Sequence, residues 1–149
     1  MNTGKIMPTT YLLIAMLEMF TIHFLFPGLL IIPLFYNLLG IIPMLLGVAL
    51  NLVADGAFHK FNTTVKPFQE SSSLVTNGVY RISRNPMYLG FVLILIGIAV
   101  LLRSLTPFLI ILAFGIWVQR KFITVEERML AEKFGAEWLA FRKRTRRWL

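Results

Sequence analysis

Four stretches of the sequence are almost wholly apolar, and polar segments separate them. They cover about residues 10–35, 38–58, 86–102 and 106–122. A helix needs about 20 apolar residues to cross a bilayer core of ~30 Å, so each stretch is predicted to span a membrane. We therefore expect an all-α fold, an integral membrane bundle of about four transmembrane helices.

Turn and cap signals mark where these helices meet. Thr106-Pro107 places an N-cap before a proline at the first helical position, so the fourth span should begin there. The short connection at Tyr36-Asn37 predicts an antiparallel pair for the first two spans. Gly40 and Gly47 lie seven residues apart on one helix face, which indicates close packing against a neighbouring helix.

The charged tail, residues 123–145, is predicted to form an amphipathic helix. Its acids come first and its bases last, the order that the helix dipole favours. Its apolar positions recur at helical spacing: Leu130, Phe134, Trp138 and Phe141. Such a helix could lie on the membrane surface or fold back over the loop at 76–85.

Composition agrees with a lipid-embedded protein. Of 149 residues 57% are hydrophobic, and the mean hydropathy is +0.73, so we expect a single membrane domain over 1–149. The absence of cysteine excludes disulfides and thiolate metal sites, and the two histidines show no metal-ligand spacing. The net charge of +8 favours anionic membrane headgroups at the basic tail as partner, rather than nucleic acid.

The basic residues also predict an orientation. With four spans, 14 of the 15 lysines and arginines fall on one side, and only Arg103 lies opposite. The positive-inside rule predicts that this side, with both termini, lies in the cytoplasm, and we expect the cell inner membrane as the location. Glu18 and His23 fall inside the first span, where ionisable groups usually face protein or water, but the sequence assigns them no role.

The polar segment 60–85 interrupts the apolar pattern at the same side. Asn77-Gly78 is a strong turn signal, and Pro86 suits the first turn of a new helix. Taken alone, the segment could be a loop whose arginines face phospholipid headgroups.

Three patterns in order carry a family resemblance. They are Leu74-Val75-Thr76-Asn77-Gly78-Val79-Tyr80, then Arg84-Asn85-Pro86-Met87-Tyr88-Leu89-Gly90, then Glu126-Glu127 followed by Leu130, Phe134-Gly135 and Trp138. Over about residues 60–149 the chain resembles the isoprenylcysteine carboxyl methyltransferase family and its bacterial relatives. Phospholipid methyltransferases share a looser version of this layout.

The resemblance implies a membrane methyltransferase that uses S-adenosyl-L-methionine and a lipophilic or amphipathic acceptor. The loop and the tail helix would close the cofactor pocket, and no Rossmann fingerprint is present. The cofactor-binding residues that it implies are Ser72, Ser73, Leu74, Val75, Gly78, Tyr80, Asn85, Pro86, Met87, Tyr88, Glu126 and Glu127. Arg84 and Arg120 are candidate substrate contacts. No catalytic residue and no metal ligand is assigned.

These residue types suit that chemistry. A carboxylate such as Glu126 can accept hydrogen bonds from ribose hydroxyls or an ammonium group. The rings of Tyr80 and Tyr88 can stack on adenine or lie near a sulfonium. Methyl transfer needs alignment and exclusion of water more than a covalent intermediate.

Two positions depart from the family pattern. Asn85 stands where the family often has histidine, so no proton-transfer role is assigned to it. Phe122 stands where prenylcysteine enzymes have an arginine for the substrate carboxylate. Isoprenylcysteine-like O-methylation and N-methylation of a lipid amine therefore both stay open. Other hypotheses are an NADPH-dependent membrane sterol or lipid reductase and a non-catalytic membrane subunit.

Overall fold

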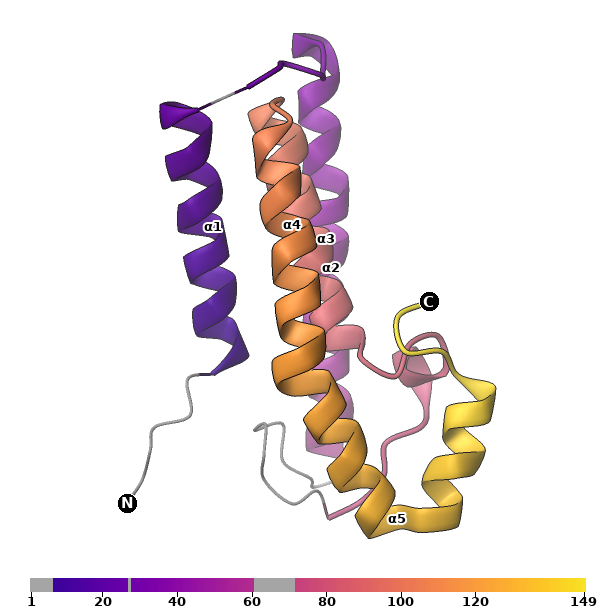
Figure 1. The fold of residues 1–149 in the computed structure, drawn as a ribbon. Coiled ribbons are helices and arrows are strands. Elements are labelled where there is room, and N and C mark those ends of the chain that lie inside the picture. Colours follow the sequence, from indigo (N-terminus) through magenta and orange to yellow (C-terminus); the bar gives the residue numbers. More distant parts are fainter. Residues whose placement is uncertain (1–6, 27, 61–71) are drawn as a thin grey trace.

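The computed structural model describes residues 7–26, 28–60 and 72–149. In chain order its elements are α1 (Pro8–Leu25), the 3₁₀ turn η1 (Leu34–Gly40), α2 (Ile41–Lys60), the 3₁₀ turn η2 (Gly78–Arg81), α3 (Pro86–Leu102), α4 (Thr106–Val118), the π-helical turn η3 (Gln119–Ile123) and α5 (Thr124–Arg144). The first four α-helices run roughly parallel to one axis, and α5 leaves them at the end of the bundle where α1 begins (Figure 1).

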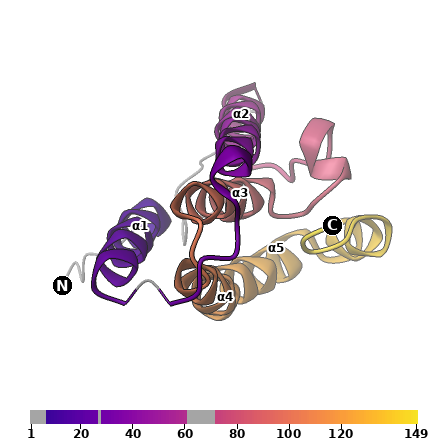
Figure 2. The same ribbon diagram turned by 90° about the horizontal axis from the view of Figure 1, so that it is seen from above.

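Within the described residues, three helical stretches are long and apolar enough to cross a membrane: Pro8–Leu25, Leu34–Lys60 and Thr106–Arg144. The fourth, α3, is apolar but shorter, with 17 residues. Viewed along the bundle axis, α3 lies in the middle, with α1, α2 and α4 around it (Figure 2). This central helix therefore provides much of the core, and Leu95 and Ala99 on it are fully buried.

Glycines allow η1 and α2 to touch α3 through their backbones. A Cβ atom on Gly40 would collide with the carbonyl oxygen of Gly97, and one on Gly47 with that of Gly90. The predicted close-packing face on the second span is thus confirmed. Its contact surface is the main chain of α3, because only glycine leaves room for such an approach.

The first helix ends at Leu25, well before the expected residue 35. Phe26 precedes a proline and leaves the helix with φ −142°, and Gly28 has a positive φ of +64°. The chain then crosses the end of the bundle, where Ile31 N–H donates to Arg103 O at 2.9 Å and Leu105 N–H donates to Leu29 O at 3.0 Å. As a result α1 packs on α4 and α2 packs on α3, so the expected neighbouring pair of α1 and α2 does not form (Figure 2).

The tail helix folds back toward the loop before α3 instead of continuing straight. Gly135 has φ +45° and ψ −112°, so it breaks α5 into two arms. The four apolar tail positions named above, Leu130, Phe134, Trp138 and Phe141, all pack in one cluster with Tyr80 and Val75 of the loop. Of the two placements that the sequence left open, the structure has the fold-back.

Candidate functional site

The first turns of α3 and α5 meet through one hydrogen bond. Tyr88 O–H donates to Glu126 Oε1 at 2.8 Å. Tyr88 is buried, with 7% of its surface exposed, and it lies in the first turn of a helix that begins at Pro86. Proline suits that first position because its missing N–H would have no partner there. Two residues far apart in sequence are therefore held together at one end of the bundle.

A π-helical turn precedes Glu126 in the chain. Thr124 Oγ1 donates to Gln119 O at 2.8 Å across this wider turn. Such turns are frequent at functional sites because they change which side chains face a neighbour. Here Phe122 and Ile123 are both buried although they are adjacent. The Phe122 ring lies 5.6 Å from Tyr11 and 6.2 Å from Tyr88, between centroids.

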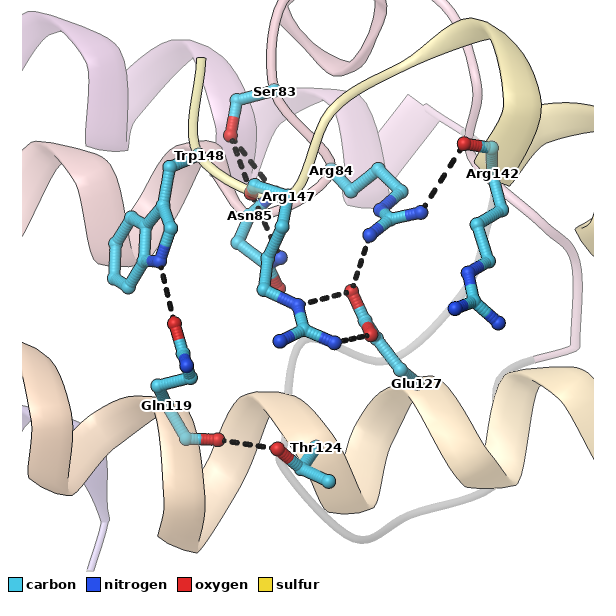
Figure 3. Close-up of polar contacts among 9 residues, drawn as sticks. All are labelled: Ser83, Arg84, Asn85, Gln119, Thr124, Glu127, Arg142, Arg147 and Trp148. Atoms are coloured by element: carbon cyan, nitrogen blue, oxygen red, sulfur yellow. Dashed lines mark hydrogen bonds and ion pairs between the residues drawn. The ribbon is translucent and has the colours of Figure 1, made fainter.

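Glu127 occupies a separate ion cluster beside this turn (Figure 3). Arg84 Nη2 lies 3.0 Å from Glu127 Oε1, and Arg147 Nη2 donates to Oε2 at 2.6 Å. The Arg147 Nε donates to Oε1 at 3.2 Å. Hydrogen bonding to Glu127 raises the Arg147 pKa, whereas burial lowers the pKa of Arg84. Both oxygens of Glu127 are therefore occupied by arginines from the loop and the tail.

The C-terminal strap, which we define as residues 145–148, is bonded to the segment before α3 (Figure 3). Arg84 N–H donates to Arg146 O at 3.0 Å, and Asn85 Nδ2 donates to Arg147 O at 3.1 Å. The Ser83 hydroxyl donates to the same carbonyl at 3.2 Å. Asn85, predicted as a cofactor-binding residue, thus acts in the structure as an anchor for the strap.

Tyr80 lies in the apolar cluster under the second arm of α5. Its ring lies 5.5 Å from that of Phe58 on α2, between centroids, in an edge-on arrangement. Burial, with smaller contributions from the charges of Glu126 and Asp55, raises the Tyr80 pKa above its ordinary range. The phenol therefore stays protonated and can donate a hydrogen bond.

The two adjacent glutamates differ in whether a basic side chain is paired with them. Glu127 is neutralised by two arginines. Glu126 has no basic partner among the described residues, and its Oε2 accepts no hydrogen bond from them. Burial raises the pKa of Glu126, and the hydrogen bond from Tyr88 opposes that shift. Its Oε2 is left as a free acceptor for a donor or cation on a bound molecule.

The other predicted residues lie around this region in different ways. Leu74 and Met87 pack on the Tyr80 cluster, and Pro86 is buried at the start of α3. Gly78 starts η2 with φ +63° and is exposed, while Ser72 and Ser73 lie at the start of the described loop. Arg120 is exposed, and no contact among the described residues brings it to Tyr88 or Glu126.

The inward role of two arginines was not predicted from the sequence. Arg84 was a candidate substrate contact, and Arg147 belongs to a basic segment that resembles a headgroup anchor, but both bind Glu127. One signal was present, because Glu127 has no lysine or arginine three or four residues away to neutralise it within its own helix. The bond from Trp148 Nε1 to Gln119 Oε1 at 2.9 Å had no such signal.

Comparisons with known proteins place this geometry in context. The sequence profile described as "Phospholipid methyltransferase" matches residues 35–137. A "Protein-S-isoprenylcysteine O-methyltransferase" from Saccharomyces cerevisiae is 39% identical over 144 residues, covering 87% of this chain and 57% of the relative. "Protein-S-isoprenylcysteine O-methyltransferase A" from Arabidopsis thaliana is 34% identical over 135 residues, covering 87% of this chain and 66% of the relative.

A solved structure shares the fold. It is titled as the eukaryotic intramembrane Ras methyltransferase ICMT, and it superposes with a TM-score of 0.68 at 24% identity, covering 95% of this chain and 51% of that one. This likeness confirms the predicted all-helical membrane architecture. The chain spans less than two thirds of the length of each of these three proteins.

Proposed function

The chain belongs to the phospholipid methyltransferase family, and we propose that it is an S-adenosylmethionine-dependent membrane methyltransferase with a lipophilic acceptor. The resemblance seen in the three sequence patterns is confirmed by the matching profile and by the relatives named as isoprenylcysteine methyltransferases. The assignment of cofactor, acceptor and site residues to this chain is the proposal.

The unbalanced carboxylate of Glu126 is the observation that carries the proposal. S-Adenosylmethionine has a sulfonium and an ammonium cation, together with ribose hydroxyls that donate hydrogen bonds. A carboxyl group with a free oxygen and no arginine paired with it among the described residues suits such groups, and a 2.8 Å hydrogen bond from Tyr88 fixes its orientation. The free oxygen of Glu126 is therefore a suitable acceptor for the hydrogen-bond donors and cations of the cofactor.

The remaining residues would complete the binding site. The aromatic rings of Tyr80 and Tyr88 offer faces for adenine or a cation. Main-chain N–H groups of the turn at 72–80 are suited to a carboxylate. When bound, S-adenosylmethionine would supply an activated methyl group. The protein's contribution would be alignment of the acceptor and exclusion of water, which the strap and the second arm of α5 support by covering the loop.

The surroundings of Phe122 favour a methyl acceptor that has no carboxylate near this residue. The Phe122 side chain is 1% exposed and packs on Tyr11 and Tyr88, so apolar rings occupy the position of the family's arginine. Arg120, two residues earlier in the sequence, is exposed. We therefore favour N-methylation of a lipid amine, with O-methylation of a prenylated cysteine as the second candidate because of the relatives' names.

We also propose the orientation and the surface partner. The ends of α2 and α3 that border the loop, together with α5, would face the cytoplasm at the inner membrane, as the distribution of basic residues predicts. Four exposed cations of the tail would contact anionic headgroups: Arg142, Lys143, Arg144 and Arg146.

Calorimetry on the detergent-solubilised protein tests the cofactor. S-Adenosylhomocysteine should bind to the wild type, and Glu126→Gln should weaken that binding about ten- to a hundredfold, the loss expected for a hydrogen bond to a charged group. Glu132→Gln is the matched control, because Glu132 is an exposed acid of the same helix. Binding of NADPH in place of S-adenosylhomocysteine would support a reductase, and binding of neither would support a non-catalytic subunit.

Transfer of a labelled methyl group tests the acceptor. An aminolipid and a farnesylated cysteine with a free carboxylate are offered side by side in proteoliposomes. We expect the aminolipid to be labelled. Labelling of the farnesylated cysteine alone would overturn the acceptor preference and leave the cofactor assignment standing.

A further inference from the structure

The π-helical turn between α4 and α5 is held through its first residue, Gln119. The main-chain oxygen of Gln119 accepts two hydrogen bonds from Thr124, one from the N–H and one from the hydroxyl at 2.8 Å. Its side-chain oxygen accepts a third bond, from the indole N–H of Trp148 at 2.9 Å (Figure 3). An indole N–H can only donate, so the Gln119 amide must present its oxygen to Trp148. The strap is therefore bonded to the residue at which the turn begins.

The strap also holds the far side of this turn. Arg147, which precedes Trp148, donates from Nη2 to Glu127 Oε2 at 2.6 Å and from Nε to Oε1 at 3.2 Å. The main-chain carbonyl of Arg147 accepts two hydrogen bonds from side chains before α3. Trp148 is half-buried and packs against the core cluster that contains Phe122. Two adjacent, anchored residues of the strap thus bridge the π-helical turn, one at its start and one beyond its end.

Regular α-helical geometry would not present both of these side chains to one strap. Consecutive residues turn by about 100°, so Gln119 and Glu127, which are eight positions apart, would point about 80° away from each other. A π-helical turn accommodates one extra residue, which reduces this difference to about 20°. Gln119 and Glu127 accordingly lie on the side of the helix that faces the strap (Figure 3). The two strap contacts therefore fit the π-helical form of this segment.

The same turn sets the direction of Glu126. If residues 119–123 relaxed to a regular α-helix, Val125 would take the angular position that Glu126 has now, and Glu126 would turn away by about 100°. The hydrogen bond from Tyr88 O–H to Glu126 Oε1 at 2.8 Å therefore depends on the π-helical turn.

We propose that Trp148 is a positioning residue, which acts on cofactor binding through Glu126. The inference rests on the proposed function, in which Glu126 binds S-adenosylmethionine. Relaxation of the turn to a regular α-helix would separate Gln119 from Glu127 in direction and so break a strap contact. The bond from Trp148 to Gln119 thus stabilises the π-helical form, and that form directs Glu126 to Tyr88.

Amide hydrogen exchange of the detergent-solubilised protein, followed by mass spectrometry, tests the contact without a cofactor. Trp148→Phe keeps an aromatic ring against the core but removes the N–H donor. Exchange within residues 119–126 should become about fivefold faster, as expected for one lost hydrogen bond, whereas exchange in the middle of α3 should stay the same. Trp117→Phe is the matched control, since Trp117 is 49% exposed and contacts Tyr11. Equal exchange in the wild type and Trp148→Phe would overturn the proposal.

Calorimetry then distinguishes positioning from a general loss of structure. Trp148→Phe should weaken S-adenosylhomocysteine binding about fivefold at a temperature where the variant is folded. In a Glu126→Gln background the same substitution should have almost no further effect, because Trp148 acts through Glu126. Unchanged binding by Trp148→Phe, or equal losses in both backgrounds, would refute the positioning role. A wild type that does not bind S-adenosylhomocysteine would instead refute the proposed function, and the exchange measurement would still decide whether Trp148 holds the turn.

Discussion

Glu126 and Glu127 are adjacent, yet the structure predicts opposite consequences when each is removed. Glu127→Ala should destabilise the protein, and Glu126→Ala should mainly abolish binding of the cofactor. In the Glu127 cluster the side chains of Glu127 and Arg84 are only 11% and 7% exposed, and the ring of Trp138 lies 5.6 Å from the Arg84 guanidinium. Loss of Glu127 would leave the Arg84 charge almost buried without its counterion.

The magnitude follows from that burial. Breaking a buried ion pair by removing one partner costs about 3–5 kcal/mol, and we expect the lower end, about 3 kcal/mol, because Arg147 is 33% exposed and can turn to water. Glu126→Ala removes one hydrogen bond, so it should cost about 1 kcal/mol. The sharper prediction is therefore the ratio of the two losses in unfolding free energy, that of Glu127→Ala to that of Glu126→Ala.

Unfolding in a denaturing detergent, followed by tryptophan fluorescence, measures both variants. Trp138 is buried against the cluster and reports its loss. The double variant Arg84→Gln/Glu127→Gln is the control, because it removes the charge and its partner together and should recover more than half of the lost stability. If Glu126→Ala proved as destabilising as Glu127→Ala, or if the double variant recovered nothing, the division of roles would be refuted.

Three further changes test other contacts. Tyr88→Phe should weaken S-adenosylhomocysteine binding about tenfold in calorimetry and cost about 1 kcal/mol of stability, because it removes the hydrogen bond that orients Glu126. Gly47→Ala should lower the unfolding free energy by ~2 kcal/mol through its collision with α3, whereas Gly56→Ala, with open space around it, should raise it slightly; equal effects would contradict the packing. Gly135→Ala should cost about 1–3 kcal/mol and expose the tail to limited proteolysis, because a φ of +45° with a ψ of −112° is a conformation that glycine adopts far more readily than alanine.

The helices of the bundle could be predicted because local signals determine them. Apolar runs, Thr106-Pro107 and the glycines of the second span each act within a few residues. The break after Leu25 was also encoded locally, in Pro27-Gly28, but the long apolar run concealed it. Hydropathy alone cannot distinguish a continuing helix from a chain that crosses the end of a bundle.

The site could be predicted only in part because its contacts are long-range. The approach of Arg147 to Glu127 spans 20 residues, and that of Arg84 to Arg142 O spans 58. A basic tail has the same composition whether its arginines face lipid headgroups or a buried carboxylate. The π-helical turn at 119–123 changes which residues face the bundle, and no simple residue pattern specifies it.

The divergence of the two glutamates has a geometric cause. Consecutive residues on a helix point about 100° apart, so adjacent acids at the junction of a bundle and a folded-back tail cannot face the same neighbour. Glu126 points to Tyr88 on α3, and Glu127 points to the loop and the strap. The Glu-Glu pair at this junction therefore combines two roles in one helical turn. Glu127 holds the loop and the strap in place, and the adjacent Glu126 is proposed to bind the cofactor. Any change that shifts the register of this turn by one residue should disturb both tasks together.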